Sequence, residues 1–420
     1  MIRWGLGVLL PAAIAAGPAR AAEPGQTVIS SDYGSLAVSA ILQGWFAARF
    51  DGSYIDRDAD GVVDDRDDAY ANGHVDFTVD AARLVLKGNL LSPNLTYVFQ
   101  GDAVVPGFLL DARMGFILPE DEGISTTISG GRFLPPFTLM LPRLSSRLET
   151  IRYPLYLFNT YGESAPARQP FAFPETIGRQ VGLNVTQRLT PMFQIDVGVF
   201  NGFQHTLEAA GWADENDLKD LFARVQVQPV DDLLLAVDYW LGFPVSLDRA
   251  VDDDPATPAD ETHAASPFAV SATDPTWQND TAHFLVVEAA FTAVDGLRVF
   301  GELAYSRQTL RTQDLGGGNP AETRADALGG WLHVGWTFEG LFAAGIDLEL
   351  VARFDMLDPD INTPDNQMMR VTFGPQLFLE GLHSQIRLNY LANLSQTSRT
   401  PAEDFDDVRH ELLVQLTVEL

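Results

Sequence analysis

The sequence predicts an all-β protein: a transmembrane antiparallel β-barrel of about sixteen strands, each of roughly ten residues. Three observations lead to this fold class. Apolar and polar residues alternate with a period of two, the predicted strands have the length that a tilted strand needs to cross a bilayer, and short connections take turns with long ones. A closed barrel leaves no strand edge unpaired in lipid, so we expect the strands to form one domain.

The N-terminal residues have the pattern of an export signal. Arg3 provides a positive charge, residues 4–16 are apolar, and Ala19-Arg20-Ala21 offers small residues for cleavage. This apolar run is shorter than the roughly 20 residues of a spanning helix. We therefore expect residues 1–21 to be a signal peptide and residues 22–420 to be the barrel domain.

Alternation defines the strands that follow. In the last strand, Leu412, Val414 and Leu416 fall on one face, and Gln415 and Thr417 fall on the other. In chain order the predicted strands cover residues 35–50, 74–87, 94–103, 108–117, 124–134, 177–187, 192–201, 219–229, 232–243, 281–292, 297–308, 328–338, 343–355, 367–379, 383–393 and 408–420.

The connections between these strands form two classes. The short ones are residues 88–93, 118–123, 188–191, 230–231, 293–296, 339–342 and 380–382. The others are residues 51–73, 135–176, 202–218, 244–280, 309–327, 356–366 and 394–407, which are long, and residues 104–107. Outer-membrane barrels have tight periplasmic turns and longer extracellular loops, whereas a soluble sandwich has no reason to keep its long loops at one end.

The third of the same-side connections carries the strongest functional signal. Pro135-Pro136 ends the strand before it, and about forty residues without period-two alternation follow. We expect this loop to fold into the barrel and narrow its pore. The candidate pore-lining cations are Arg132, Arg143, Arg147, Arg152, Arg168 and Arg179. In the alternative interpretation these arginines pair with Glu149, Glu163, Glu175 and acids of the lumen, and only hold the loop in place.

Three stretches carry a resemblance to a known family. They are Arg83-Leu84-Val85-Leu86-Lys87-Gly88, Gly131-Arg132-Phe133-Leu134-Pro135-Pro136-Phe137, and Ile177-Gly178-Arg179-Gln180-Val181 followed by Gly198-Val199-Phe200-Asn201-Gly202. In this order they resemble the phosphate-selective porin O and P family of bacterial outer-membrane channels. The resemblance implies a homotrimer that passes small solutes or ions, anions such as phosphate among them, by diffusion. Leu134 and Thr138 stand where that family has lysine and glycine. In the family, lysines of the pore are associated with phosphate selectivity. Arginine can replace lysine as a phosphate ligand, because its planar group binds phosphate through two hydrogen bonds.

The first long loop contains a candidate calcium site. Asp56, Asp58, Asp60, Val62, Asp64 and Asp67 follow the spacing of a calcium-binding loop, with Gly61 at the sharp turn and aspartate in place of the usual glutamate at the last position. A solvated acidic loop is the alternative. A second acidic stretch, at residues 251–263, is a candidate contact with lipopolysaccharide through divalent ions.

Composition excludes several other classes. The chain has no cysteine, only 27 Lys and Arg against 57 Asp and Glu, and a formal net charge of −30, which argues against nucleic acid as a partner. The sequence has no phosphate-binding loop or nucleophile elbow, so we expect no enzyme. We therefore expect a porin for passive diffusion in the bacterial outer membrane. The alternative is a non-conducting barrel that acts as an adhesin or structural surface protein.

Overall fold

The computed structural model describes a little less than three fifths of the chain. The described residues are 27–31, 33–50, 74–104, 109–119, 123–140, 150–157, 179–201, 219–243, 281–312, 321–343, 345–358, 361–362, 367–379, 384–394 and 410–419. Among these residues, no helix is long and apolar enough to cross a membrane.

The described part of the chain contains seventeen strands. They are β1 (Thr27–Ser31), β2 (Gly34–Phe50), β3 (His74–Leu90), β4 (Ser92–Asp102), β5 (Leu109–Ile117), β6 (Ser125–Phe133), β7 (Gln180–Thr190), β8 (Phe193–Phe200), β9 (Asp220–Val230), β10 (Leu233–Gly242), β11 (Thr281–Phe291), β12 (Leu297–Thr312), β13 (Ala321–Ala343), β14 (Ile346–Asp358), β15 (Met368–Leu379), β16 (Ser384–Asn393) and β17 (His410–Glu419).

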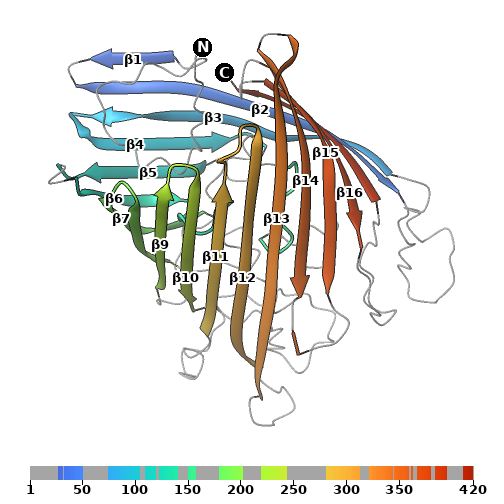
Figure 1. Cartoon of the computed structure of the whole chain (residues 1–420). Helices are drawn as coiled ribbons and strands as arrows, with labels where there is room; N and C mark the ends of the chain where they lie inside the picture. The colour runs from blue at the N-terminus through green and yellow to red at the C-terminus, as the bar shows by residue number, and fades with distance from the viewer. Residues whose placement is uncertain are drawn as a thin grey trace, which may run out of the picture.

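The strands β2 to β17 form a closed barrel of sixteen antiparallel strands, which confirms the predicted fold class (Figure 1). Each strand pairs with the next along the chain. The ring closes where β17 pairs with β2, with His410 opposite Phe50 and Glu419 opposite Ile41. The short strand β1, which the sequence pattern did not predict, pairs with the first residues of β2, beyond the end of β17.

Two predicted boundaries were wrong. The connection predicted at residues 309–327 is shorter, because Thr312 of β12 lies opposite Ala321 of β13. Likewise β13 reaches Ala343, past an irregularity after Phe338. In both places the apolar alternation ends before the strand does. The backbone hydrogen bonds between the two strands continue beyond it, in a region where the outward side chains do not have to be apolar.

The two faces of the barrel have opposite composition. On β10, Leu235, Val237 and Tyr239 are exposed, while the alternate residues Ala236, Asp238 and Trp240 are buried. The same contrast holds on the other strands, whose large exposed residues are apolar and whose buried residues include many that are charged or amide-bearing. A soluble protein shows the reverse order, so the outward face is built to contact lipid and the inward face is built around polar groups.

Candidate functional site

The described parts of the third long connection lie inside the barrel, as predicted. It leaves β6 after Phe133 and returns at β7, and the structure describes two parts of it, a first segment (residues 134–140) and a second segment (residues 150–157). Both contact side chains of strands on other sides of the barrel, from β9 round to β17. The loop therefore crosses the lumen.

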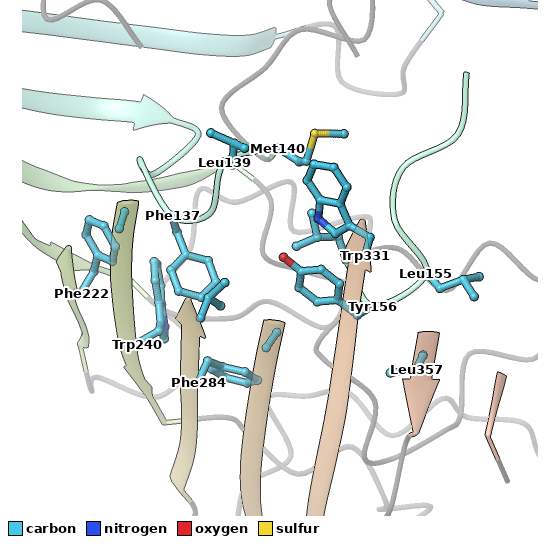
Figure 2. Close-up of a cluster of buried hydrophobic side chains, with 14 of the residues drawn as sticks. Phe137, Leu139, Met140, Leu155, Tyr156, Phe222, Trp240, Phe284, Trp331 and Leu357 are labelled. Atoms are coloured by element: carbon cyan, nitrogen blue, oxygen red, sulfur yellow. The ribbon is translucent and has the colours of Figure 1, made fainter. Parts of the chain in front are cut away.

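Apolar packing holds the first segment. The ring of Phe137 meets Phe222 of β9 and Trp240 of β10 edge-on, with ring centroids 6.0 Å and 5.6 Å apart (Figure 2). Leu139 and Met140 are also buried in this cluster, which extends across the inner faces of β8 to β15. Burying apolar side chains stabilises this position of the loop by about 25 cal/mol for each Å² removed from water.

A single carboxylate joins the two segments to the wall. Glu302 of β12 accepts hydrogen bonds from the backbone N–H groups of Leu139 and Met140, from the Tyr156 hydroxyl, and from Trp331 Nε1 at 2.6 Å. Burial, together with the neighbouring Glu302 carboxylate, raises the pKa of Tyr156 well above its usual value, so the phenol stays protonated and remains a donor. Four donors around one buried carboxylate offset its loss of hydration.

A buried ionic cluster lies beside this carboxylate. Arg224 of β9 donates through both terminal nitrogens to Glu288 of β11, at 2.8 Å and 2.7 Å, and its Nη1 lies 3.2 Å from Asp238 Oδ1 of β10. The same nitrogen reaches the carbonyl oxygen of Pro136 at 3.5 Å. Arg224 therefore neutralises acids of the wall and also contacts the loop.

Arginines of β14 and β15, further round the barrel, hold the second segment. Arg353 of β14 donates to Thr150 Oγ1, to the Arg152 carbonyl oxygen at 2.7 Å and to the Tyr153 carbonyl oxygen at 3.2 Å. Arg370 of β15 donates to the Tyr153 carbonyl oxygen at 2.6 Å. Both guanidinium groups also form ion pairs with Asp355. The negative charge of Asp355 offsets the repulsion between the two arginines.

The structure describes three of the six arginines that were predicted to line a pore. Arg152 forms an ion pair of 2.9 Å with Glu411 and lies 4.6 Å from the centre of the Trp45 ring, and Arg179 forms an ion pair of 2.8 Å with Asp111. Arg132 donates from Nε to the Leu110 carbonyl oxygen at 3.1 Å. Arg143, Arg147 and Arg168 lie outside the described residues, and a pore-lining role for the set stays a prediction.

The predicted calcium ligands also lie outside the described residues. These are Asp56, Asp58, Asp60, Val62, Asp64 and Asp67 in the first long connection. Within the described part of the chain, no group of three or more His, Asp or Glu side chains is placed to hold a metal ion.

Sequence reasoning placed Glu302 and Arg353 on the polar faces of their strands but did not single out the wall residues that hold the loop, among them Glu302, Arg224, Arg353 and Arg370, nor Arg113. The last of these belongs to β5 and lies opposite Gly131, with its guanidinium carbon 5.5 Å from the centre of the Phe133 ring. A Cβ atom at residue 131 would lie 2.1 Å from the Ala112 carbonyl oxygen, so only glycine fits there. The alternation of Arg113 with exposed Met114 and Phe116 was the signal that could have placed it in the lumen.

A closed barrel of sixteen strands, with an apolar outer face, a polar lumen and a loop folded across that lumen, is the fold of a porin. No protein-family model matches the chain, and no curated protein matches it significantly. Among solved structures, the outer-membrane channel DcaP of Acinetobacter baumannii is similar with a TM-score of 0.54 at 11% identity, over 93% of this chain and 99% of that one.

Two further solved porins support the same fold. The anion-selective porin of Comamonas acidovorans is similar with a TM-score of 0.51 at 12% identity, over 92% of this chain and 99% of that one. Salmonella typhi OmpF, solved with daunomycin, is similar with a TM-score of 0.50 at 10% identity, over 94% of this chain and 100% of that one. At this identity the likeness concerns the fold.

Proposed function

We propose that this protein is a porin of the bacterial outer membrane, a water-filled channel through which small polar solutes or ions diffuse passively. The loop that crosses the lumen carries the proposal. A barrel that served only as an adhesin or structural surface protein needs no loop with two segments bound to its inner wall. In a channel the same loop reduces the cross-section, and its attachment decides how wide the passage stays.

Conductance in planar bilayers tests this function. The full chain is expected to give stepwise ohmic openings, and removal of residues 141–166 is expected to enlarge them. The shift in gel migration on heating, which reports a folded barrel, is the control for the deletion variant. A folded protein that stays silent across the accessible voltages would overturn the proposal and favour the adhesin or structural role.

We propose anions as the preferred solutes, phosphate-bearing ones included. Arg113 faces the lumen, and within the described part of the chain no carboxylate lies close enough to form an ion pair with it. An arginine over an aromatic ring keeps its charge available to a passing anion. The reversal potential in a salt gradient is expected to show anion preference, and Arg113→Ala is expected to reduce it. An unchanged reversal potential would contradict this assignment.

We also propose that the first long loop binds calcium. The support is the spacing of Asp56, Asp58, Asp60, Asp64 and Asp67 around Gly61. Calcium is expected to slow proteolysis within this loop, and Asp58→Asn is expected to abolish the protection. Equal cleavage with calcium and with chelator would argue for a solvated acidic loop.

A homotrimer is the proposed assembly, on the basis of the resemblance in the sequence. Light scattering of the folded protein in detergent is expected to give the protein mass of three chains. A single-chain mass under mild detergent conditions would contradict it.

A further inference from the structure

A group of polar side chains interrupts the apolar outer face near the long-loop ends of β10 and β11 and on the neighbouring parts of β12 and β13. His283, Arg307 and Asp326 lie opposite one another on β11, β12 and β13. One row further from the loops, Tyr239 of β10 and Tyr305 of β12 flank Leu285. We call these five residues, His283, Arg307, Asp326, Tyr239 and Tyr305, the outer-face cluster.

Hydrogen bonds order this cluster. The Tyr239 hydroxyl lies 2.7 Å from His283 Nδ1, and the Tyr305 hydroxyl donates to Asp326 Oδ1 at 2.6 Å. Arg307 forms an ion pair of 2.7 Å with Asp326 through Nε and donates from Nη2 to the Tyr305 hydroxyl at 2.8 Å. The guanidinium group is therefore held in one orientation before any ligand arrives.

Arg307 and His283 each have a hydrogen-bond donor with no acceptor among the described residues. The side chain of Arg307 is 43% exposed, and no described residue accepts a hydrogen bond from its Nη1. In the tautomer of His283 that accepts the tyrosine hydrogen bond, Nε2 carries a proton, and no described residue accepts it. Two donors of different strands thus point away from the barrel on the side where lipid lies.

The depth of the cluster fits a lipid headgroup. The row beneath it is exposed and apolar, with Leu303 54% exposed and Val287 opposite it. His283 is the third residue of β11, so this strand ends just above the cluster, whereas β12 and β13 continue past it to Thr312 and Ala321. Tyrosines at the edge of an apolar band mark the level where acyl chains end and headgroups begin.

We propose that the outer-face cluster binds the phosphate group of a phosphorylated lipid in the outer leaflet, with Arg307 and His283 donating to the phosphate and the apolar rows below contacting the acyl chains. Arginine suits this role because its planar group forms paired hydrogen bonds with phosphate oxygens and is weakly hydrated. A fixed cation is notable in a chain whose formal net charge is −30. The proposal rests on the outer-membrane location proposed above, but not on conduction.

Native mass spectrometry of the full folded chain in detergent tests this site. The probe is bisphosphorylated lipid A, compared with the same lipid after removal of its phosphates. Arg307→Gln is expected to weaken binding of the phosphorylated lipid about fivefold, the effect of one arginine at an anionic lipid surface. Asp326→Asn is expected to strengthen it, because it removes the carboxylate that competes for Arg307.

Matched controls separate this site from general charge effects. Lys219→Gln removes the same charge at the same end of the barrel, one residue before β9, and is expected to leave lipid binding unchanged. The conductance of Arg307→Gln is expected to equal that of the unchanged chain, so failure of this proposal is distinguishable from failure of the channel function. Three outcomes would each overturn the proposal. They are an equal loss of lipid A binding in Lys219→Gln and Arg307→Gln, binding of the dephosphorylated lipid as strong as that of lipid A, and displacement of lipid A by inorganic phosphate at the same concentration as by lipid A itself.

Discussion

The two segments of the lumenal loop are both buried among apolar side chains, but different charged groups of the wall bind their backbones. The first segment meets a wall of aromatic side chains and the Glu302 carboxylate, which accepts from the backbone N–H groups of Leu139 and Met140. The second segment meets Arg353 and Arg370, which donate to its backbone carbonyl oxygens. The acids of the wall therefore face loop donors, and the arginines face loop acceptors.

This difference shows that the charge pattern of the lumen has a structural role as well as a role toward solutes. Apolar burial contributes to both attachments, since Leu155, Tyr156 and Leu157 of the second segment lie in the same cluster as the first segment, and this contribution should weaken on cooling and in denaturant. The second attachment also depends on buried arginines, whose interactions salt screens only weakly. Substitutions of Glu302 and substitutions of Arg353 or Arg370 should consequently change the channel in different ways.

The largest effect is expected from Glu302→Ala. This change removes the acceptor of four donors, those of Leu139, Met140, Tyr156 and Trp331. Breaking a buried charged network typically costs about 3–5 kcal/mol, so the free energy of unfolding should fall by about that amount. Release of the loop should also give larger and noisier single-channel currents.

Glu302→Gln is the matched control for this variant. The amide keeps one acceptor oxygen of the same reach, so most of the loop attachment should persist. Urea unfolding followed by tryptophan fluorescence gives the stability, and bilayer recordings give the current noise. Equal behaviour of the alanine and glutamine variants would show that the apolar cluster alone holds the first segment.

A smaller loss is expected from Arg353→Met. The variant loses the donors to Thr150, to Arg152 and to Tyr153, but Arg370 still reaches the Tyr153 carbonyl oxygen and still contacts Asp355. We expect a decrease of about 2 kcal/mol in the free energy of unfolding, since hydrogen bonds to charged groups contribute about 1.5–3 kcal/mol each and part of the network remains. The double variant Arg353→Met/Arg370→Met should lose clearly more than either single variant. Additive single effects would mean that the two arginines act independently.

The barrel was predictable from the sequence, but the loop attachment was not. Alternation along a strand is a local pattern, and the order of short and long connections follows from the chain passing back and forth across a membrane. The contact between Leu139 and Glu302 joins residues 163 positions apart, and no local pattern encodes which wall strand a loop will meet. Strands β12 and β13 were predicted, but their ends were missed because these ends extend past the apolar band.

A modest effect is expected from Arg152→Ala. Arg152 contributes an ion pair with Glu411 and a contact with the Trp45 ring, and its side chain is mostly buried. A partly exposed ion pair and a cation–π contact together contribute about 1 kcal/mol. The stability should fall by that amount, and the anion preference in a salt gradient should fall with it if Arg152 also borders the passage. Arg152→Lys keeps the charge but not the planar stacking, so it should restore the ion preference and only part of the stability.

The smallest effect is expected from Thr138→Gly, in the first segment. Thr138 has φ of 64°, in the left-handed region that a β-branched residue adopts only with strain, and it stands between Phe137 and Leu139, both buried. Glycine relieves that strain, but it also increases the freedom of the unfolded chain, so the net gain in the free energy of unfolding should be about 0.5 kcal/mol. Thr138→Ala is the control, because it keeps the Cβ atom that causes the strain while removing the hydroxyl. If the glycine variant is less stable than the alanine variant, the surrounding cluster does not impose this backbone conformation, and the first segment is held less rigidly than its burial indicates.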